Sequence, residues 1–255
     1  MRKLGKAVPL VILVGLVFLA FGSLAWANAM KKDVLRVGTE STYPPFEFRD
    51  KNNKLVGFDI DLMEAIAKKI GKKIEWVDMP FDSLIPALLA GKIDVIAAGM
   101  SATKERAKRV AFSIPYYISL SSFLVRADDN SIKSLKDLKG KTIAVQLGTV
   151  QDTFCSSIPG VKMKRFQKFD DCVREVVLGR ADATLMDKVV ALKYCESKDF
   201  KGKVKIAFDQ VITEAGKALA VRKEDKDLLR AINRAIEEMK KNGELQALLD
   251  KWFKQ

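Results

Sequence analysis

The sequence predicts an α/β protein made of two similar lobes, and two observations lead to this fold class. Beyond residue 30, short apolar runs alternate with longer amphipathic ones, as strands and helices alternate in α/β domains. In addition, two short patterns occur once in each half of the chain. Chance similarity between two strand–helix units is the alternative explanation for these patterns.

The first half of the chain contains five expected elements. A strand at 34–39 ends in Gly-Thr and precedes a helix at 58–71, which places Leu62 and Ile66 on one apolar face. Gly71 is a natural stop for this helix. The other three elements are a strand at 73–77, a helix at 84–90 and a buried strand at 94–98.

The second half repeats this order of elements. A strand at 142–145 runs into Leu-Gly-Thr, and a helix is expected at 170–178. Two further helices are expected at 226–242 and 244–253, because apolar residues recur there at helical spacing.

The recurring patterns place two strand ends in each half. Val-Gly-Thr at 37–39 matches Leu-Gly-Thr at 147–149, and a glycine there lets the backbone approach a ligand closely. A longer pattern of helix, glycine, cation, any residue, aspartate and strand occurs at 90–99 and at 178–187. Its register aligns Gly99 with Asp187. Because ligands bind at the carboxyl ends of strands in open α/β sheets, we expect a cleft shared by both halves.

Composition excludes several classes of function. Of the 255 residues, 48% are hydrophobic and 30% are charged, which is typical of a globular protein of one or two domains. The chain has no histidine, which excludes Ser-His and Cys-His catalysis and His-ligated zinc. The net charge of +13 is scattered over helix-like segments without a basic stripe, so no nucleic-acid partner is expected.

The first thirty residues have the pattern of a secretory signal peptide. Three basic residues within the first six positions precede an uncharged apolar run that closes in Ala25-Trp26-Ala27. We expect cleavage after Ala27 or Ala29, and removal of residues 1–27 leaves a net charge of +10. A retained membrane anchor is the alternative, because the uncharged stretch is just long enough to span a bilayer.

Three cysteines, Cys155, Cys172 and Cys195, fall in one later region of the chain. Export permits a disulfide, and the odd number would leave one thiol over. Buried free thiols are equally compatible with the sequence, which does not select a pair.

Seven short segments occur in an order that resembles a known family. They are GTESTYPPFEF at 38–48, GFDIDL at 57–62, FDSLIPAL at 81–88, GKID at 91–94, MSATKER at 100–106, GTVQ at 148–151 and GRAD at 179–182. Each alone is a weak signal, but together they resemble the polar-amino-acid family of bacterial periplasmic solute-binding proteins. The similarity covers the whole mature chain and is strongest to lysine/arginine/ornithine-, histidine- and arginine-binding members.

The resemblance implies the two-lobe periplasmic-binding-protein fold, in which each lobe is a central β-sheet flanked by helices and two hinge strands join the lobes. Residues 33–119 with 213–255 would form the first lobe and 120–212 the second, with crossings near 120–126 and 208–219. The protein would be a periplasmic monomer that encloses a small-molecule amino acid. It would deliver this ligand to the membrane permease of an ABC transporter and would need no cofactor or metal.

The same resemblance assigns residues to the two charged groups of a free amino acid. Arg106, with Ser101 five residues earlier, supplies a guanidinium and a hydroxyl for the α-carboxylate and matches the family's clamp. Without the resemblance, Arg106 would be interpreted as a surface arginine. Thr149 and the backbone amide of Val150 would add donors from the second lobe.

An α-ammonium needs a carboxylate and carbonyl acceptors. Asp187 and the Gly99 carbonyl lie at the paired strand ends and match the family's ammonium site. Asp187 could otherwise be an ordinary helix cap. Met100, between Gly99 and Ser101, also belongs to the expected ligand-binding set.

The side-chain pocket is expected to decide which amino acid binds. Glu40, Tyr43 and Phe81 match the acid and the two walls of basic-amino-acid binders, and aromatic faces favour cations by about 0.5–2 kcal/mol. Gln146 and Gln151 could hydrogen-bond a guanidinium or an amide equally well. Arginine or another basic amino acid is therefore the expected ligand, with glutamine or another polar amino acid as the alternative.

A cyclohexadienyl (prephenate/arogenate) dehydratase on the same fold is the alternative from another class of function. Such an enzyme needs a proton donor in the cleft beyond the amino-acid clamp. The sequence shows no obvious additional acid, so a binding protein rather than an enzyme is expected. A detached ligand-sensing protein is a third interpretation.

Overall fold

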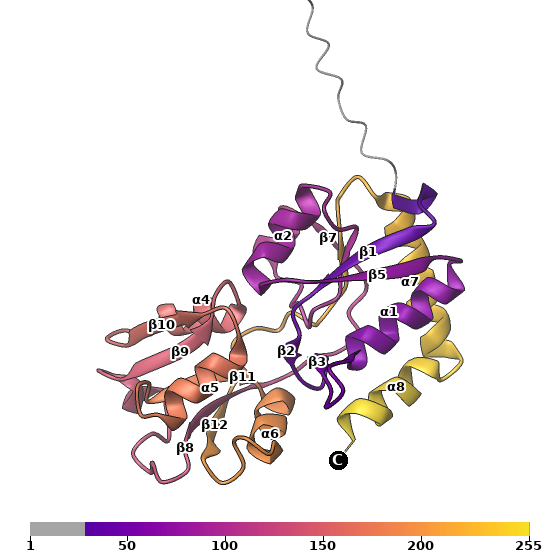
Figure 1. Ribbon diagram of the computed structural model, residues 1–255. Coiled ribbons are helices and arrows are strands. Elements are labelled where there is room, and N and C mark those ends of the chain that lie inside the picture. The colour runs from indigo at the N-terminus through magenta and orange to yellow at the C-terminus, as the bar shows by residue number, and fades with distance from the viewer. Residues whose placement is uncertain (1–28, 255) are drawn as a thin grey trace, which may run out of the picture.

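Two lobes, each built on a five-stranded sheet with helices packed against it, make up the computed structural model, which describes residues 29–254 (Figure 1). The predicted two-lobe α/β fold is confirmed. The expected signal peptide and the membrane-anchor alternative lie outside the described residues. Within 29–254, no helix is both long and apolar enough to cross a membrane.

The first sheet joins strands from distant parts of the chain. In spatial order it contains β5 (Lys73–Asp78), β1 (Val34–Thr39), β6 (Val95–Ile96), β13 (Ala220–Val221) and β7 (Ala111–Phe112). Strand β1 is parallel to β5 and β6, whereas β13 is antiparallel to both its neighbours. The longer helices of this lobe are α1 (Phe58–Lys69), α2 (Phe81–Leu89), α7 (Lys226–Lys241) and α8 (Glu244–Phe253).

The second sheet comes from one continuous stretch of chain. In spatial order it contains β10 (Lys162–Phe166), β9 (Thr142–Gln146), β11 (Ala183–Asp187), β8 (Ser121–Arg126) and β12 (Val204–Gln210). Strand β9 is parallel to β10 and β11, whereas β8 is antiparallel to β11 and β12. Its helices are α4 (Val150–Ser156), α5 (Phe169–Val177) and α6 (Lys188–Glu196).

The chain passes between the two sheets twice, at 113–120 and at 211–219. The first crossing precedes the expected 120–126, because Ser121–Arg126 is strand β8, which is hydrogen-bonded on both sides within the second sheet. The boundaries expected for the lobes, 33–119 with 213–255 and 120–212, stay a prediction. The smaller elements are β2 (Thr42–Tyr43), β3 (Glu47–Arg49), β4 (Leu55–Val56), the short helix α3 (Lys104–Ala107) and 3-10 turns at Ala29–Lys31 and Leu135–Leu138.

Helix boundaries follow local chemistry. Helix α1 buries the expected face, including Leu62 and Ile66, and stops before Gly71, whose φ of 69° is left-handed. Helix α2 begins at Phe81, earlier than the expected 84–90, so that Pro86 lies in the middle of the helix rather than in its first turn. Because proline has no N–H, the carbonyl four residues before Pro86 receives no helical hydrogen bond from it.

The aspartate of the recurring pattern makes equivalent contacts in both lobes. Asp94 accepts the N–H of Arg36 through Oδ2 at 3.1 Å and donates its own N–H to the Arg36 carbonyl at 2.7 Å. Asp182 makes the same pair of contacts with Thr142, at 2.7 and 2.8 Å. Each aspartate therefore joins the start of one strand to the neighbouring strand. The repetition in the sequence corresponds to a repeated structural unit.

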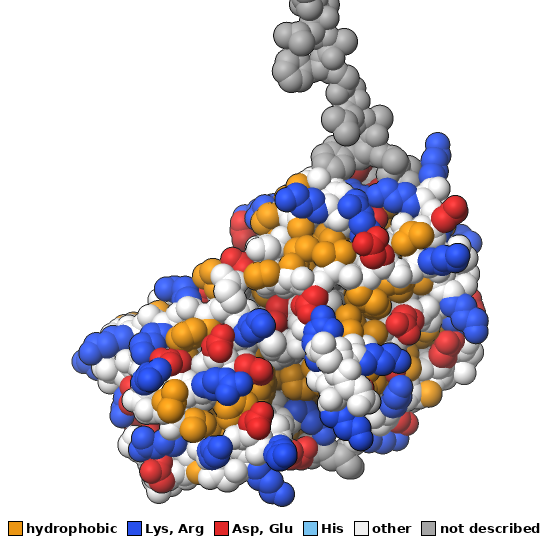
Figure 2. All heavy atoms as spheres, viewed as in Figure 1, with side chains coloured by type: hydrophobic (Ala, Val, Ile, Leu, Met, Phe, Trp, Pro, Cys, Tyr) orange, Lys and Arg blue, Asp and Glu red, His pale blue; other side chains and the backbone are white. Residues whose placement is uncertain are grey.

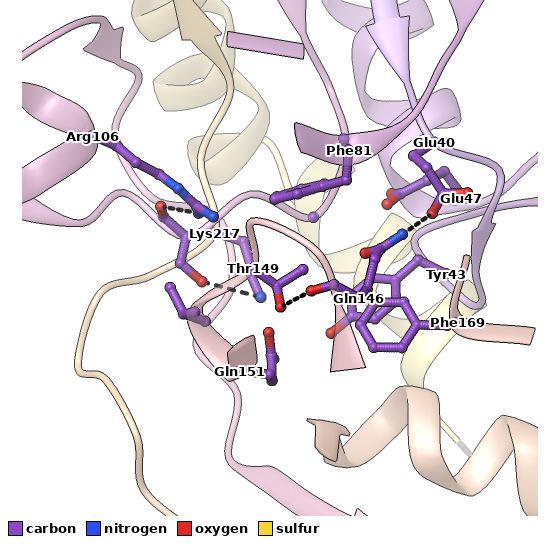
Figure 3. Close-up of a pocket in the computed structure, with 14 residues that line it drawn as sticks. Glu40, Tyr43, Glu47, Phe81, Arg106, Gln146, Thr149, Gln151, Phe169 and Lys217 are labelled. Carbon is purple, nitrogen blue, oxygen red and sulfur yellow. Dashed lines mark hydrogen bonds between the residues drawn. The ribbon is translucent and has the colours of Figure 1, made fainter. Parts of the chain in front are cut away.

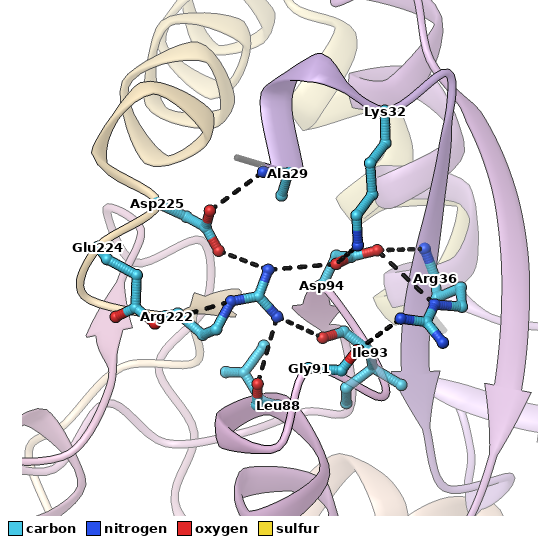
Figure 4. Close-up of polar contacts among 10 residues, drawn as sticks. All are labelled: Ala29, Lys32, Arg36, Leu88, Gly91, Ile93, Asp94, Arg222, Glu224 and Asp225. Atoms are coloured by element: carbon cyan, nitrogen blue, oxygen red, sulfur yellow. Dashed lines mark hydrogen bonds and ion pairs between the residues drawn. The ribbon is translucent and has the colours of Figure 1, made fainter. Parts of the chain in front are cut away.

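Arg222, which is 1% exposed, is the centre of a buried polar network in the first lobe (Figure 4). Its guanidinium contacts the carbonyls of Leu88 and Ile93 at 3.3 and 2.7 Å and the carboxylates of Asp94 and Asp225 at 3.2 and 2.7 Å. Asp225 in turn accepts the N–H of Ala29 at 3.2 Å. The network thus connects the start of the described chain to the segment before α7.

All three cysteines are free thiols, so the disulfide that export would permit is not formed. Cys155 and Cys172 are buried, and burial raises the pKa of Cys155 to about 12. These two residues therefore pack as small hydrophobic side chains.

Charges of both signs are mixed on the molecular surface. On the face seen in Figure 2, Lys and Arg side chains are interspersed with Asp and Glu, and no stripe of one sign crosses it. Several charged side chains of the described residues form ion pairs at the surface, such as Lys188 with Asp209 at 2.6 Å. The charge of this face is therefore that of a solvated surface.

Candidate ligand-binding site

A cavity lies between the two lobes, next to the carboxyl ends of strands from both sheets (Figure 3). Ten of the twelve expected site residues line it: Glu40, Tyr43, Phe81, Gly99, Ser101, Arg106, Gln146, Thr149, Val150 and Gln151. The remaining two lie close by. Met100 lines an adjoining groove, and Asp187 is a buried side chain that contacts cavity residues. That these residues bind a ligand stays a prediction.

The guanidinium of Arg106 contacts both lobes at one end of the cavity. It lies on α3, whose N-cap Thr103 accepts the Arg106 N–H at 3.2 Å. The guanidinium donates from Nη1 to the Ser101 carbonyl at 2.9 Å and from Nη2 to the Gly148 carbonyl of the other lobe at 3.0 Å. Burial lowers the pKa of Arg106 to about 10, so the group remains charged at neutral pH. Its central carbon lies 5.2 Å from the centroid of the Phe81 ring.

The second lobe contributes the first turn of α4. Thr149 is the N-cap of this helix, because its hydroxyl accepts the N–H of Asp152 at 3.1 Å while donating to the Gln146 carbonyl at 2.8 Å. The hydroxyl of Thr149 is therefore used locally. Val150 is the first helical residue, so its N–H has no acceptor within the helix.

Glu40 lies at the other end of the cavity from Arg106 (Figure 3) and is 4% exposed. Its carboxylate accepts from Gln146 Nε2 at 2.8 Å and from Thr42 Oγ1 at 2.8 and 2.9 Å. Burial raises the pKa of Glu40 to about 7, an effect that these hydrogen bonds only partly oppose. At neutral pH the group is close to half ionised, and a cation beside it would favour the ionised form.

Two stacked rings form one wall of the cavity. The centroids of Tyr43 and Phe169 are 4.7 Å apart, and Phe169 is the first residue of α5. The Tyr43 hydroxyl accepts the N–H of Asp187 at 3.1 Å and so connects the lobes. Phe169 was not expected, because it lies outside every motif and one residue before the helix expected at 170–178.

Gly99 adopts a left-handed conformation, with φ of 51°. Its N–H donates to Oδ2 of the buried Asp59 at 2.7 Å, and a Cβ at Gly99 would lie 3.1 Å from the Tyr43 ring. Both the backbone angle and the close ring therefore favour glycine at this strand end.

Lys217 is the largest departure from the expected site. Its Nζ lies 2.5 Å from Asp187 Oδ2 and 3.2 Å from Ser101 Oγ, and the Lys217 and Asp187 side chains are 5% and 4% exposed. We expected Asp187 to contact the ammonium of a ligand, but an ammonium of the chain itself occupies that carboxylate. The only signal in the sequence is one charged residue directly before a buried apolar run.

Glu47 is a second acid in the cleft that is not among the predicted site residues. It lines the cavity, is 1% exposed and lies within the segment 38–48. Burial, together with the nearby Asp59 and Glu40, raises the pKa of Glu47 well above its usual value. The expectation that the cleft has no additional acid is therefore wrong.

Comparison with known proteins agrees with this geometry. The family model for bacterial extracellular solute-binding proteins, family 3, matches residues 35–255. The arginine-binding extracellular protein ArtP of Bacillus subtilis (strain 168) is 41% identical over 237 residues, which cover 92% of this chain and 91% of that protein.

Two solved structures with the same fold are described as an ancestral arginine-binding protein. One is bound to arginine and has a TM-score of 0.83, covering 87% of this chain and 99% of that one at 48% identity. The other is bound to glutamine and has a TM-score of 0.82, covering 88% of this chain and 99% of that one at 48% identity.

Proposed function

The chain belongs to family 3 of the bacterial extracellular solute-binding proteins, and from this premise we propose that it captures arginine, or another basic amino acid, between its two lobes. The resemblance expected from the seven sequence segments is thereby confirmed. One observation carries the ligand proposal: Arg106 and Glu40, a half-buried guanidinium and a buried acid, lie at opposite ends of one cavity (Figure 3).

This arrangement matches the charges of a basic amino acid. An α-carboxylate bound at Arg106 would direct the side chain toward Glu40, past the Tyr43 and Phe169 rings. A cation there would meet the carboxylate of Glu40 and the faces of the rings. An arginine-binding relative and a related structure with bound arginine support this choice. The structure with bound glutamine keeps glutamine as the alternative.

Replacement of Glu40 by glutamine is expected to separate the two ligands. Loss of the buried counter-charge should weaken arginine binding by at least about 30-fold, since truncating one partner of a buried charge pair costs about 2–5 kcal/mol. Glutamine binding should change by less than about threefold. Isothermal titration of both proteins with both ligands measures these ratios. Tighter binding of glutamine than of arginine by the unaltered protein would identify the alternative ligand as the correct one.

Arginine binding is expected to weaken as the pH falls below 7. Burial raises the pKa of Glu40 to about 7. A bound cation lowers that pKa, so binding releases a proton and affinity declines by up to about tenfold per pH unit below 7. Titrations between pH 5.5 and 8.5 test this. Glu40→Gln is the matched control, and an equally steep profile in that variant would exclude Glu40 as the titrating group.

We also propose export to the periplasm, action as a monomer and delivery of the ligand to an ABC permease. The family assignment supports an extracellular or periplasmic place of action. Closure of the lobes on a ligand would present both lobes together to the permease.

Cleavage of the leader is expected after Ala27 rather than after Ala29. Ala29 is fully buried, begins a 3-10 turn and donates its N–H to Asp225 at 3.2 Å, so the folded protein uses it. Intact mass of the purified mature protein should correspond to a chain that begins at Asn28. A chain that begins at Met30 would contradict this prediction, and a chain that retains residues 1–27 would support a membrane anchor.

A dehydratase on the same fold is a second candidate, and Glu47 is the observation that favours it. Burial raises the pKa of Glu47 and so favours its protonated form, which is the form that a proton donor needs. We propose binding without catalysis, because the family relative named above is a binding protein. When arogenate is incubated with the protein, we expect mass spectrometry to find the arogenate unchanged. Loss of water and carbon dioxide from arogenate would show that the protein is an enzyme.

A further inference from the structure

The ammonium of Lys217 is enclosed in the cleft by groups from both lobes. Its Nζ lies 2.5 Å from Asp187 Oδ2 in the second lobe and 3.2 Å from Ser101 Oγ in the first. The ring centroids of Tyr43 and Phe46 are 5.8 and 5.9 Å away. Figure 3 shows the side chain directed toward the cavity beside Thr149 and Gln151.

The backbone beneath Lys217 is held in place. Its N–H donates to the Tyr117 carbonyl at 2.7 Å, and its carbonyl accepts the N–H of Tyr116 at 2.9 Å. The next residue, Ala218, donates to the Met100 carbonyl at 3.0 Å. The lysine therefore enters the cleft from a fixed position on the second crossing segment, and only its side chain is free to withdraw.

Lys217 makes the contact that a ligand α-ammonium would need. The carboxylate assigned to that ammonium is Asp187, and its Oδ2 already faces a cation. The other oxygen, Oδ1, has the Gln151 amide at 3.4 Å. A second ammonium at Asp187 must either displace Lys217 or lie beside a like charge in a buried site, and both are unfavourable.

We propose that Lys217 is a specificity-determining residue, an internal competitor at the ammonium subsite that reduces the requirement for an α-amino group. The site then accepts carboxylates with a distal cation and no α-amino group nearly as well as the matching α-amino acids. In such a complex the Lys217–Asp187 pair stays intact and only Arg106 and Glu40 bind the ligand. The inference rests on the proposed capture of a basic amino acid.

The test compares arginine with desaminoarginine, which has hydrogen in place of the α-amino group. The unaltered protein should bind the two ligands within about tenfold of each other. In Lys217→Met, Asp187 becomes available, so arginine should bind at least about tenfold more tightly. Desaminoarginine should bind no more tightly than before, because it leaves the Asp187 carboxylate buried and unpaired. Isothermal titration gives all four affinities.

Lys188→Met is the matched control. It removes a lysine adjacent in sequence to Asp187, but that lysine forms a surface ion pair with Asp209 at 2.6 Å and is 42% exposed. Both affinities should stay within about twofold of the unaltered protein. Lys217→Gln, measured in the same way, takes the place of Lys217→Met if thermal unfolding shows that the methionine variant does not fold.

An unchanged arginine-to-desaminoarginine ratio in the Lys217 variant would overturn the proposal, as would weaker arginine binding in it. Failure of the proposed function would give a result that differs from those two. If the unaltered protein binds glutamine but not arginine, the basic-ligand assignment fails. The same comparison with glutamine and desaminoglutamine then decides the role of Lys217, because the α-amino group is common to both amino acids.

Discussion

Arg106→Ala is expected to weaken the binding of every α-amino acid ligand by about 30-fold to several thousand-fold. The guanidinium is half-buried, remains charged at neutral pH and bridges the Ser101 and Gly148 carbonyls of opposite lobes. Its removal would leave a ligand carboxylate buried without its cation, a loss of about 2–5 kcal/mol. Isothermal titration with arginine and glutamine measures the effect, which should be similar for both ligands.

Two further variants make the Arg106 prediction specific. Arg106→Lys should recover part of the affinity, since a point charge replaces a two-pronged donor. Lys104→Ala removes an exposed cation from the same short helix and should change binding by less than about twofold. If Arg106→Ala bound ligand as tightly as Lys104→Ala, the carboxylate clamp would have to be elsewhere.

Arg222→Met is expected to lower the free energy of unfolding by about 3–5 kcal/mol. Arg222 is 1% exposed and contacts two buried carboxylates and two carbonyls of the first lobe. Methionine fills the space but leaves those groups without their cation. Asp94 retains its ion pair with Lys32 at 2.6 Å, so most of the loss in stability should come from the Asp225 carboxylate. Urea unfolding followed by circular dichroism measures the change.

The neighbouring Lys223 supplies the control for Arg222. It is exposed, donates to the Lys108 carbonyl at 2.7 Å, and its replacement by methionine should change stability by less than about 0.5 kcal/mol.

The pH dependence of stability should also distinguish Arg222→Met from the unaltered protein. Burial alone would raise the pKa of Asp94, but Lys32, the Arg36 N–H and Arg222 hold it below its usual value. The stabilisation this provides is present above about pH 4 and is lost as the pH falls through the pKa of the folded state. In Arg222→Met that loss should begin at a higher pH. Equal stability of the two variants would show that the network contributes little.

Periodicity and repetition predicted most of the first sheet. The strand at 34–39 could be predicted because it ends in Gly-Thr. The helix at 58–71 could be predicted because its apolar face stops at Gly71. The repeated aspartate marks a real structural equivalence, since Asp94 and Asp182 make the same backbone contacts. Strands β8 and β12 were not expected as elements. They lie beside the crossings, where an extended hinge and a strand have similar local sequence.

The site was predicted where motifs carry it and missed where only the tertiary fold does. Glu40 and Arg106 belong to continuous segments that resemble a family, and both line the cavity. Lys217 and Phe169 come from outside those segments, and only the packing of the two lobes brings them there. Glu47 lies inside the segment 38–48, which also resembles the family. Its role was missed because no sequence pattern shows that Asp59 and Glu40 surround it in a buried site.

The topology of the two sheets also sets an order for folding. All five strands of the second sheet lie between Ser121 and Gln210, whereas the first sheet contains β13, at Ala220–Val221. During synthesis the chain emerges N-terminus first. The second lobe is therefore complete while the first still lacks strand β13 and the helices α7 and α8. The lobe that begins first in sequence is expected to finish last. Until then, the edges of β6 and β7 that pair with β13 are exposed and open to association with other chains.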